Sequence, residues 1–283
     1  MRDPFEALRE DVVPVEPDPG FAARLRERLE RAVLDPTRDW RSENMTTATR
    51  LRQGDIGFAS LWVPDADRAA AFYREVLGWR YAPDGQDLRI EEVTPGLAIR
   101  GGEEHRGLFL GYVVDDVTRA AERVRRAGGR AGEPAREPYG LAVRCEDRQG
   151  LPFAVYEPAA EARAAAEPRP GEVCYLTIDL VDAAEAREFY GAVLGWEFVP
   201  GSVPDGWAVR TGGAEVRPMT GLWGGRERSV AVPMYSVADI GAAVARVREL
   251  GGTGTDPQGR PYGIEARCLD DQGTPFYLGQ LGG

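Results

Sequence analysis

The sequence predicts an α+β protein made of two tandem modules, because one set of motifs occurs twice in the same order. The segment Phe72–Trp79 returns as Phe189–Trp196, an offset of 117 positions. The tripeptide Pro138-Tyr139-Gly140 returns as Pro261-Tyr262-Gly263, an offset of 123. Further matches at this second offset are Arg144-Cys145 with Arg267-Cys268 and Gly150 with Gly273. The second copy has therefore gained six residues between its first helix and its later strands.

The first half of a copy is predicted to contain a strand, a helix and further strands. Residues 56–63 alternate in polarity and are rich in β-formers, which is typical of a strand. Asp65 is suited to cap a helix that begins near Ala66, and Gly78 is suited to end it. Two or three short strands follow, to about Gly101. The apolar residues at helical spacing are Ala70, Phe72, Tyr73, Val76 and Leu77.

The second half of a copy repeats this order. A strand over residues 108–114 leads into a helix over residues 117–127, and Gly128-Gly129 ends the helix. Two more strands, over residues 141–145 and 152–157, close the copy. We therefore place the first module at residues 54–158 and the second at residues 172–281.

Two segments lie outside the repeat. Residues 1–50 form a leader with a short amphipathic helix, and residues 159–171, rich in Ala, Glu and Pro, form a linker. The leader helix is expected to dock on its own chain, and the alternative is that it binds a partner protein. Because the repeat is complete without the leader, we expect the modules to fold without it. Its apolar stripe, bounded by Pro19 and Pro36, is Phe21, Leu25, Leu29 and Val33.

Composition excludes several classes of partner and chemistry. The net charge of −11 opposes binding to nucleic acid and to anionic membranes. No apolar run approaches the roughly 18 residues needed to span a bilayer, and residues 1–10 do not form a secretory signal, so we expect a cytoplasmic protein. The odd set Cys145, Cys174 and Cys268 argues against a disulfide framework, and we expect buried thiols. The chain has no lysine and one histidine, His105, which excludes a two-histidine metal site.

The ordered motifs resemble the vicinal oxygen chelate superfamily, which includes glyoxalases, bleomycin resistance proteins and extradiol dioxygenases. The resemblance covers about residues 54–281. It implies that each module holds two βαβββ units whose sheet curls into a half-barrel with the helices outside and a pocket on the concave face. The motifs that carry it in the first copy are Pro64-Asp65, Phe72-Tyr73, Leu77-Gly78-Trp79, Val114-Asp115-Asp116, Gly128-Gly129, Pro138-Tyr139-Gly140 and Asp147-x-x-Gly150. In the second copy they are Asp182, Phe189-Tyr190, Leu194-Gly195-Trp196, Gly251-Gly252, Pro261-Tyr262-Gly263 and Asp270-x-x-Gly273.

Enzymes of this superfamily hold a divalent metal, and the resemblance places its ligands at three positions in each copy. The histidine position on the first strand holds Phe58 in one copy and Tyr175 in the other. The next position matches Phe109 and Val232. The glutamate near the end of the last strand matches Glu157, but Gln280 in the second copy. Because such metals need nitrogen or carboxylate ligands in threes, we expect no metal and no cofactor.

The concave faces are expected to carry the ligand site, because alternate residues of a strand share a face. On the first strands the predicted inward sets are Phe58, Ser60 and Trp62, then Tyr175, Thr177 and Asp179. On the last strands they are Phe153, Val155 and Glu157, then Phe276, Leu278 and Gln280. Trp207 and Trp223 are candidate stacking residues. The ordinary alternative is that the phenylalanines are core, that Glu157 is solvent-exposed and that the tryptophans are packed strand ends.

These observations predict a glyoxalase-like, bleomycin resistance-like protein that binds a small organic molecule, expected to be aromatic, for resistance or sequestration without metal. The alternative is a glyoxalase-like lyase or dioxygenase-like enzyme with altered ligands, or one in which Glu157 or Asp179 acts as an acid or base. We expect the two copies to pair within one chain about a pseudo-twofold axis, so that the protein is a monomer, although a homodimer stays open.

Overall fold

The computed structural model describes residues 49–137, 139–159, 163–164, 167–260 and 262–282. These residues belong to one compact unit. The predicted leader helix with Phe21, Leu25, Leu29 and Val33 lies outside the described residues. In the predicted linker, β11 (Arg163–Ala164) pairs with β1 (Thr49–Arg50), so this segment returns to the start of the first copy.

The first copy contains the strand-helix-strand order twice, as its sequence predicts. The first half contains β2 (Ile56–Trp62), α3 (Ala66–Leu77), β3 (Tyr81–Asp84), β4 (Asp87–Ile90) and β5 (Gly96–Arg100). The second half contains β6 (Gly107–Val113), α4 (Val117–Arg126), β7 (Arg130–Ala131), β8 (Ala135–Glu137), β9 (Gly140–Glu146) and β10 (Pro152–Pro158).

The second copy follows the same order. Its first half contains β12 (Val173–Asp179), α5 (Ala183–Leu194), β13 (Trp196–Pro200), β14 (Gly206–Thr211), β15 (Ala214–Glu215) and β16 (Thr220–Trp223). Its second half contains β17 (Val230–Ser236), α6 (Ile240–Glu249), β18 (Thr253–Gly254), β19 (Gln258–Arg260), β20 (Gly263–Leu269) and β21 (Pro275–Leu281).

The helix boundaries follow from residues that satisfy free backbone groups. Asp65 accepts a hydrogen bond from the amide of Arg68 and so caps the start of α3. Gly78 ends α3 with φ of 72°, a left-handed conformation that costs glycine little. In α5, Asp182 caps the start of the helix and Gly195 ends it. The capping residues predicted from the sequence are therefore confirmed in α3.

Each copy forms one curled sheet. In the first copy the strand order is β3-β4-β5-β2-β6-β10-β9, with β7 and β8 along β9. In the second copy the order is β13-β14-β16-β12-β17-β21-β20. A single bridge between Leu108 and Ala231 joins the two sheets. Below, the outer face of a sheet is the face covered by helices, and the inner face is the opposite, concave face.

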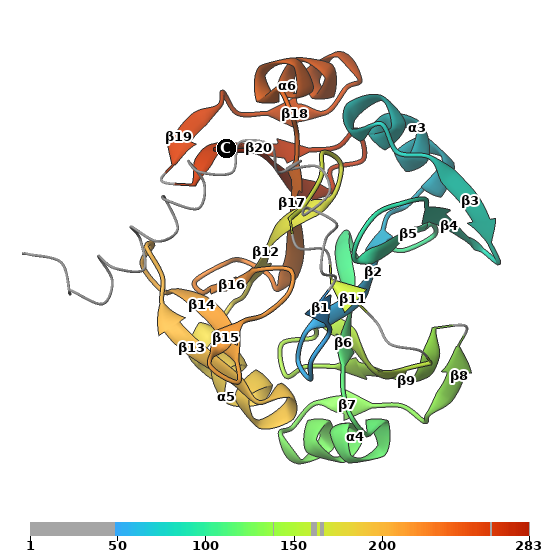
Figure 1. Ribbon diagram of the computed structural model, residues 1–283, viewed down its shortest axis with the longest axis vertical. Helices are drawn as coiled ribbons and strands as arrows, with labels where there is room; N and C mark the ends of the chain where they lie inside the picture. The colour runs from blue at the N-terminus through green and yellow to red at the C-terminus, as the bar shows by residue number, and fades with distance from the viewer. Residues whose placement is uncertain (1–48, 138, 160–162, 165–166, 261, 283) are drawn as a thin grey trace, which may run out of the picture. The chain divides into compact units, whose positions relative to one another are not determined.

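The outer faces of both sheets share one hydrophobic core. Leu61 of β2 and Ile178 of β12 are fully buried in it. Helix α3 of the first copy packs against α6 of the second, and α4 packs against α5 (Figure 1). Each helix therefore buries part of its surface against a helix of the other copy.

Hydrogen bonds between equivalent residues show the pseudo-twofold pairing of the copies. The indole of Trp79 donates to the carbonyl of Gly171 at 2.8 Å, and the indole of Trp196 donates to the carbonyl of Gly54 at 2.9 Å. The hydroxyl of Tyr73 donates to Asp270 at 3.3 Å, and that of Tyr190 donates to Asp147 at 2.9 Å. These contacts run from each copy to the other, as a pseudo-twofold axis within one chain requires.

Candidate functional site

The inner face of the first copy is filled by its own aromatic rings. Phe58 lies 4.3 Å from Tyr139 and 5.0 Å from Tyr156, between ring centroids. Further along β2, Trp62 stacks on Phe109 of β6, with centroids 4.8 Å apart and planes 7° apart. These rings occupy the concave space in which the resemblance places a ligand.

The second copy replaces the Trp62–Phe109 stack with smaller residues. Asp179 stands at the position of Trp62, and Val232 at the position of Phe109. A cavity of about 420 Å³ lies at this place, and both Asp179 and Val232 line it. The two inner faces therefore differ, because the substitution of an indole and a phenyl ring by smaller side chains opens the second one.

Residues of β12, β17, β18, β20 and β21 and of the loop after β16 line this cavity of the second copy. Asp179 ends β12 and Val232 lies in β17, while Arg267 of β20 and Tyr277 of β21 face each other across an antiparallel pair. Arg226 comes from the loop after β16. The wall combines one carboxylate, two guanidinium groups and one phenol, which is a polar set typical of a small-molecule site.

The charges of the cavity are only partly paired. Nε of Arg226 lies 3.5 Å from Oδ2 of Asp179, while Oδ1 of Asp179 is buried and, within the described ranges of the chain, has no hydrogen-bond partner. Burial raises the pKa of Asp179 above its usual range, and Arg226, Arg267 and Arg228 partly oppose that rise. Burial also raises the pKa of the Tyr277 phenol. The site thus retains unused hydrogen-bonding capacity on Asp179.

The Trp223 ring contacts two arginines that line the cavity. The guanidinium of Arg226 is 4.3 Å from the centre of its ring, and that of Arg267 is 5.2 Å away. Both distances are within the range of a cation–π contact. The ring therefore holds the two cations of the cavity wall in place.

The predicted inward residues of the first strands lie on the inner faces. Asp179 lines the cavity, and the Tyr175 ring lies against Gly221, where its hydroxyl would be 2.2 Å from an added Cβ. Thr177 pairs in register with Val232. In the first copy, Ser60 lies between Phe58 and Trp62 on the same face, and no described residue forms a hydrogen bond with its buried hydroxyl.

The prediction that Glu157 and Gln280 face the pocket is wrong. Glu157 accepts a hydrogen bond from the backbone amide of Val117 at 2.7 Å, at the start of α4. Gln280 accepts one from the amide of Ile240 at 3.0 Å, at the start of α6. Both side chains therefore point to the outer face, where they satisfy free amides of a helix N-terminus.

The predicted inward residues Phe153, Val155 and Leu278 share this correction, whereas Phe276 is among the residues that line the cavity of the second copy. The rings of Phe153 and Phe276 are buried in the core, where Phe276 lies 5.5 Å from Tyr73. Val155 and Leu278 are fully buried in the same core. The residues of β10 and β21 that face inward are the alternate ones, including Tyr156 and Tyr277.

Trp207 is not a pocket residue either. Its ring packs on the outer face, and the guanidinium of Arg187 from α5 lies 3.6 Å from the ring centre. Its indole donates a hydrogen bond to Asp205 at 3.1 Å. Trp207 is therefore a packed residue at a strand end, which was the alternative expected for the tryptophans.

Comparison with known proteins identifies the family. A glyoxalase-like domain matches residues 58–156 and again residues 175–279. The chain belongs to the glyoxalase-like family. The two matches fall in the two copies of the repeat, and the fold is that of the vicinal oxygen chelate superfamily.

One protein of known sequence and two solved structures illustrate what this chain is similar to. The anthracycline biosynthesis protein DauV of Streptomyces sp. (strain C5) is 26% identical over 263 residues, which covers 82% of this chain and 95% of that protein. The 2,3-dioxygenase LapB of Pseudomonas sp. KL28 has a similar structure, with a TM-score of 0.61 at 16% identity, covering 84% of this chain and 94% of that one. The Mn(II)-bound glyoxalase of Novosphingobium aromaticivorans has a TM-score of 0.63 at 17% identity, covering 81% and 82%.

The residues of this glyoxalase-like protein do not fit the divalent metal of its superfamily. The positions implied for ligands hold Phe58, Phe109, Tyr175 and Val232, and the matching Glu157 and Gln280 serve the helices. Within the described residues, no three His, Cys, Asp or Glu side chains are grouped to hold a metal ion. Phenyl and isopropyl groups cannot coordinate, so we derive no chemical step through a metal.

His105 lies in the first copy, and Cys268, which is among the residues that line the cavity, has its pKa raised by burial to about 12. The His105 ring lies 6.1 Å from the Trp62 ring in the first copy, and burial followed by the charge of Arg228 lowers its pKa. Cys145, Cys174 and Cys268 are buried, which confirms the expected buried thiols. None of the described helices is long and apolar enough to cross a membrane.

Sequence reasoning missed Arg226, Arg267 and Tyr277. A signal for Arg267 was present, because Arg-Cys recurs in both copies next to the last strands. The expectation that Glu157 and Gln280 face inward assigned the wrong set of alternate residues to the inner face of the last strands. Tyr277 was therefore assigned to the outer face. No local pattern marked Arg226, which lies in a loop and reaches the cavity only through the fold.

Proposed function

We propose that this protein binds a planar, hydroxylated aromatic molecule in the cavity of its second copy, without a metal ion. The observation that carries the proposal is the replacement of the Trp62–Phe109 stack by Asp179 and Val232. The first copy shows that this space accepts two stacked rings. A ligand ring in the second copy would restore the lost aromatic packing there, and burial of apolar surface contributes roughly 25 cal/mol per Å².

The polar groups of the cavity support a hydroxylated ligand. The unpaired Oδ1 of Asp179 is an acceptor suited to a phenolic hydroxyl, because a buried acceptor gains a partner when that hydroxyl binds. Arg226 and Arg267 are suited to a carbonyl or phenolate oxygen. The similarity to DauV, named for anthracycline biosynthesis, also favours a fused aromatic ligand.

A fluorescence titration with 1,2-dihydroxyanthraquinone tests the proposal. Saturable quenching of the native protein is expected, with binding at least tenfold weaker in Val232→Phe, which restores the ring of the first copy. Trp207→Phe, on the outer face, is the matched control and should bind as the native protein does. Equal affinity of Val232→Phe and native protein would refute the site.

Metal independence has its own measurement. Added zinc, nickel or manganese should leave the melting temperature unchanged, because a ligand that binds only the folded state must raise it. A metal-dependent rise that Asp179→Asn abolishes would contradict the proposal. We further propose that the protein acts as a cytoplasmic monomer that sequesters or carries its ligand, since residues 54–158 and 172–281 find their pairing surfaces within one chain.

A second candidate is metal-free acid–base catalysis by Asp179. A buried carboxylate with a raised pKa and an unpaired oxygen is suited to remove a proton from carbon next to a carbonyl. The test is deuterium exchange into 2-tetralone in D₂O, followed by NMR. Acceleration by the native protein that is lost in Asp179→Asn would favour catalysis. Equal exchange in both would favour binding alone.

A further inference from the structure

A second cavity, of about 450 Å³, lies where the two copies meet. Equivalent residues of the copies face each other across it: Ile56 with Val173, and Pro95 with Pro218. None of its lining residues belongs to the cavity of the second copy described above. It is therefore a separate space, made by the pairing of the copies and absent from either copy alone.

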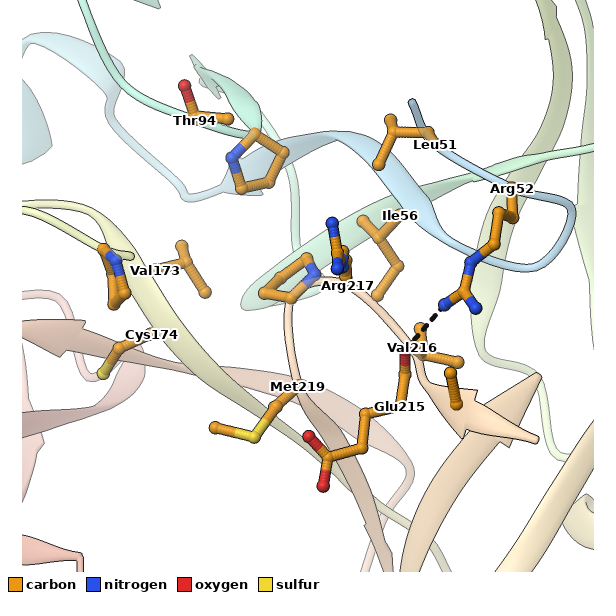
Figure 2. A pocket seen from close by; sticks show the side chains of 14 residues that line it. Leu51, Arg52, Ile56, Thr94, Val173, Cys174, Glu215, Val216, Arg217 and Met219 are labelled. Carbon is orange, nitrogen blue, oxygen red and sulfur yellow. Dashed lines mark hydrogen bonds between the residues drawn. The ribbon is translucent and has the colours of Figure 1, made fainter. Parts of the chain in front are cut away.

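One cation breaks the symmetry of this cavity. Arg217 of the second copy stands at the position held by Thr94 in the first, and both line the space. Nη1 of Arg217 is buried and has no hydrogen-bond partner among the residues that the structure describes. Figure 2 shows the Arg217 side chain in the midst of the lining residues, with the carboxylate of Glu215 turned away from it.

The neighbouring acids do not satisfy this guanidinium. The fully buried Asp55 accepts two backbone hydrogen bonds. Its Oδ1 accepts one from the amide of Arg217 at 3.0 Å, and its Oδ2 accepts one from the amide of Arg52 at 2.8 Å. The side chain of Arg52 in turn donates to the backbone carbonyl of Glu215 at 2.8 Å. Within the described part of the chain, no carboxylate is therefore hydrogen-bonded to the Arg217 side chain. A buried charged donor without a partner is costly, and an added acceptor offsets that cost.

Most of the remaining wall is aliphatic, although Arg52 and Glu215 also line the cavity. Leu51, Ile56, Val173 and Met219 contribute apolar surface, together with the two prolines, and the lining residues include no aromatic ring. This wall contrasts with the cavity of the second copy, where Tyr277 and the nearby Trp223 favour a flat ligand. An aliphatic wall suits a flexible hydrocarbon chain, whose burial is driven by apolar area alone.

We propose that the cavity between the copies binds an aliphatic carboxylate, with the carboxylate on Arg217 and the hydrocarbon chain against the aliphatic wall. A guanidinium can hold a carboxylate through charge-assisted hydrogen bonds, which are about twice as strong as neutral ones. The pseudo-symmetric position holds Thr94, and the Arg52 guanidinium already donates to the backbone carbonyl of Glu215. Arg217 is therefore the cation left to anchor the ligand, which gives the ligand one orientation. This inference is independent of the proposed aromatic ligand.

Octanoate and its neutral counterpart octanamide are suitable probes, measured by isothermal titration calorimetry on the full chain. The native protein should bind octanoate at least tenfold more tightly than octanamide. Arg217→Thr, which introduces the residue of the first copy, should abolish this preference. Arg210→Gln, which removes an exposed arginine of the second copy, should preserve it.

Two further measurements make the outcome decisive. Met219→Trp should block both probes by filling the cavity, and this half-exposed position tolerates a larger side chain even if Arg217→Thr does not fold. Octanoate should remain bound when 1,2-dihydroxyanthraquinone is added, since the two cavities share no lining residue. Absence of octanoate binding, unchanged preference in Arg217→Thr, or unchanged affinity in Met219→Trp would each overturn the assignment.

Discussion

Arg148 of the first copy and Asp271 of the second occupy equivalent positions and carry opposite charges. Asp271 forms an ion pair with Arg68 of the first copy. Arg148 pairs with Glu185, which stands at the position of Arg68 in the second copy, at 3.5 Å, and with Glu188 at 2.8 Å. The same contact is thus made twice with its charges reversed. Pairing of two identical first copies would instead place Arg68 against Arg148, so the charges favour pairing between unlike copies.

The reversed pair predicts rescue in a double mutant. Asp271→Arg should lower the melting temperature, because it places two arginines in contact. Adding Arg68→Glu should restore most of the loss by recreating the arrangement of Arg148 and Glu185. The changes should be small, since ion pairs at a partly exposed surface contribute little. Thermal denaturation of the single and double variants checks this, and a double variant less stable than Asp271→Arg would contradict it.

A capping role for Glu157 predicts a loss of stability without a loss of binding. Glu157→Ala should lower the free energy of unfolding by about 1 kcal/mol, because the amide of Val117 loses its acceptor. Glu157→Gln should be much milder, since Gln280 fills the same role in the second copy. Urea denaturation measures the stability. Loss of 1,2-dihydroxyanthraquinone binding in well-folded Glu157→Ala would restore Glu157 as a pocket residue.

The raised pKa of Asp179 predicts that the native protein and Asp179→Asn differ in stability by an amount that depends on pH. Burial raises the pKa of Asp179 in the folded state, so its contribution to stability is present below the usual pKa of an aspartate. That contribution is lost as pH rises through the raised value. The variant should therefore gain stability relative to the native protein as pH rises from 3.5 to 7, by about 1 kcal/mol or less given the partial pairing with Arg226. Denaturation at several pH values checks this, and a relative loss of stability would oppose it. Asp147 and Asp270 titrate in both proteins and cancel in the difference.

The three thiols are predicted to be unreactive in the folded protein. Burial raises the pKa of Cys145 and Cys268 to about 12 and that of Cys174 to about 11. At pH 8 the thiolate fraction is then on the order of 10⁻³ or less, and the thiolate is the reactive form. Reaction with Ellman's reagent should label no cysteine in the native state and all three after denaturation. Rapid labelling of the native protein would show that a thiol is accessible.

Local sequence patterns predicted the elements better than they predicted the site. Asp65 and Gly78 mark the ends of a helix through their own backbone chemistry, so the helix follows from a short segment. The inner faces of β2 and β12 also follow from alternation alone. The orientation of Glu157 does not, because its partner Val117 lies forty residues away and becomes a neighbour only when β10 and α4 are packed. Arg226 enters the cavity through a loop, for which no alternation applies.

The shared core has a consequence for how a duplicated gene can diverge. Outer residues such as Tyr73 and Tyr190 each donate to an aspartate of the other copy, so a change in one half must suit the other half. Inner residues face no such counterpart, and Trp62 and Asp179 differ at the same position. Mutual constraint therefore preserves the scaffold while each concave surface evolves alone. The inner face of the first copy holds a stack of its own rings, and that of the second has a cavity at the equivalent place.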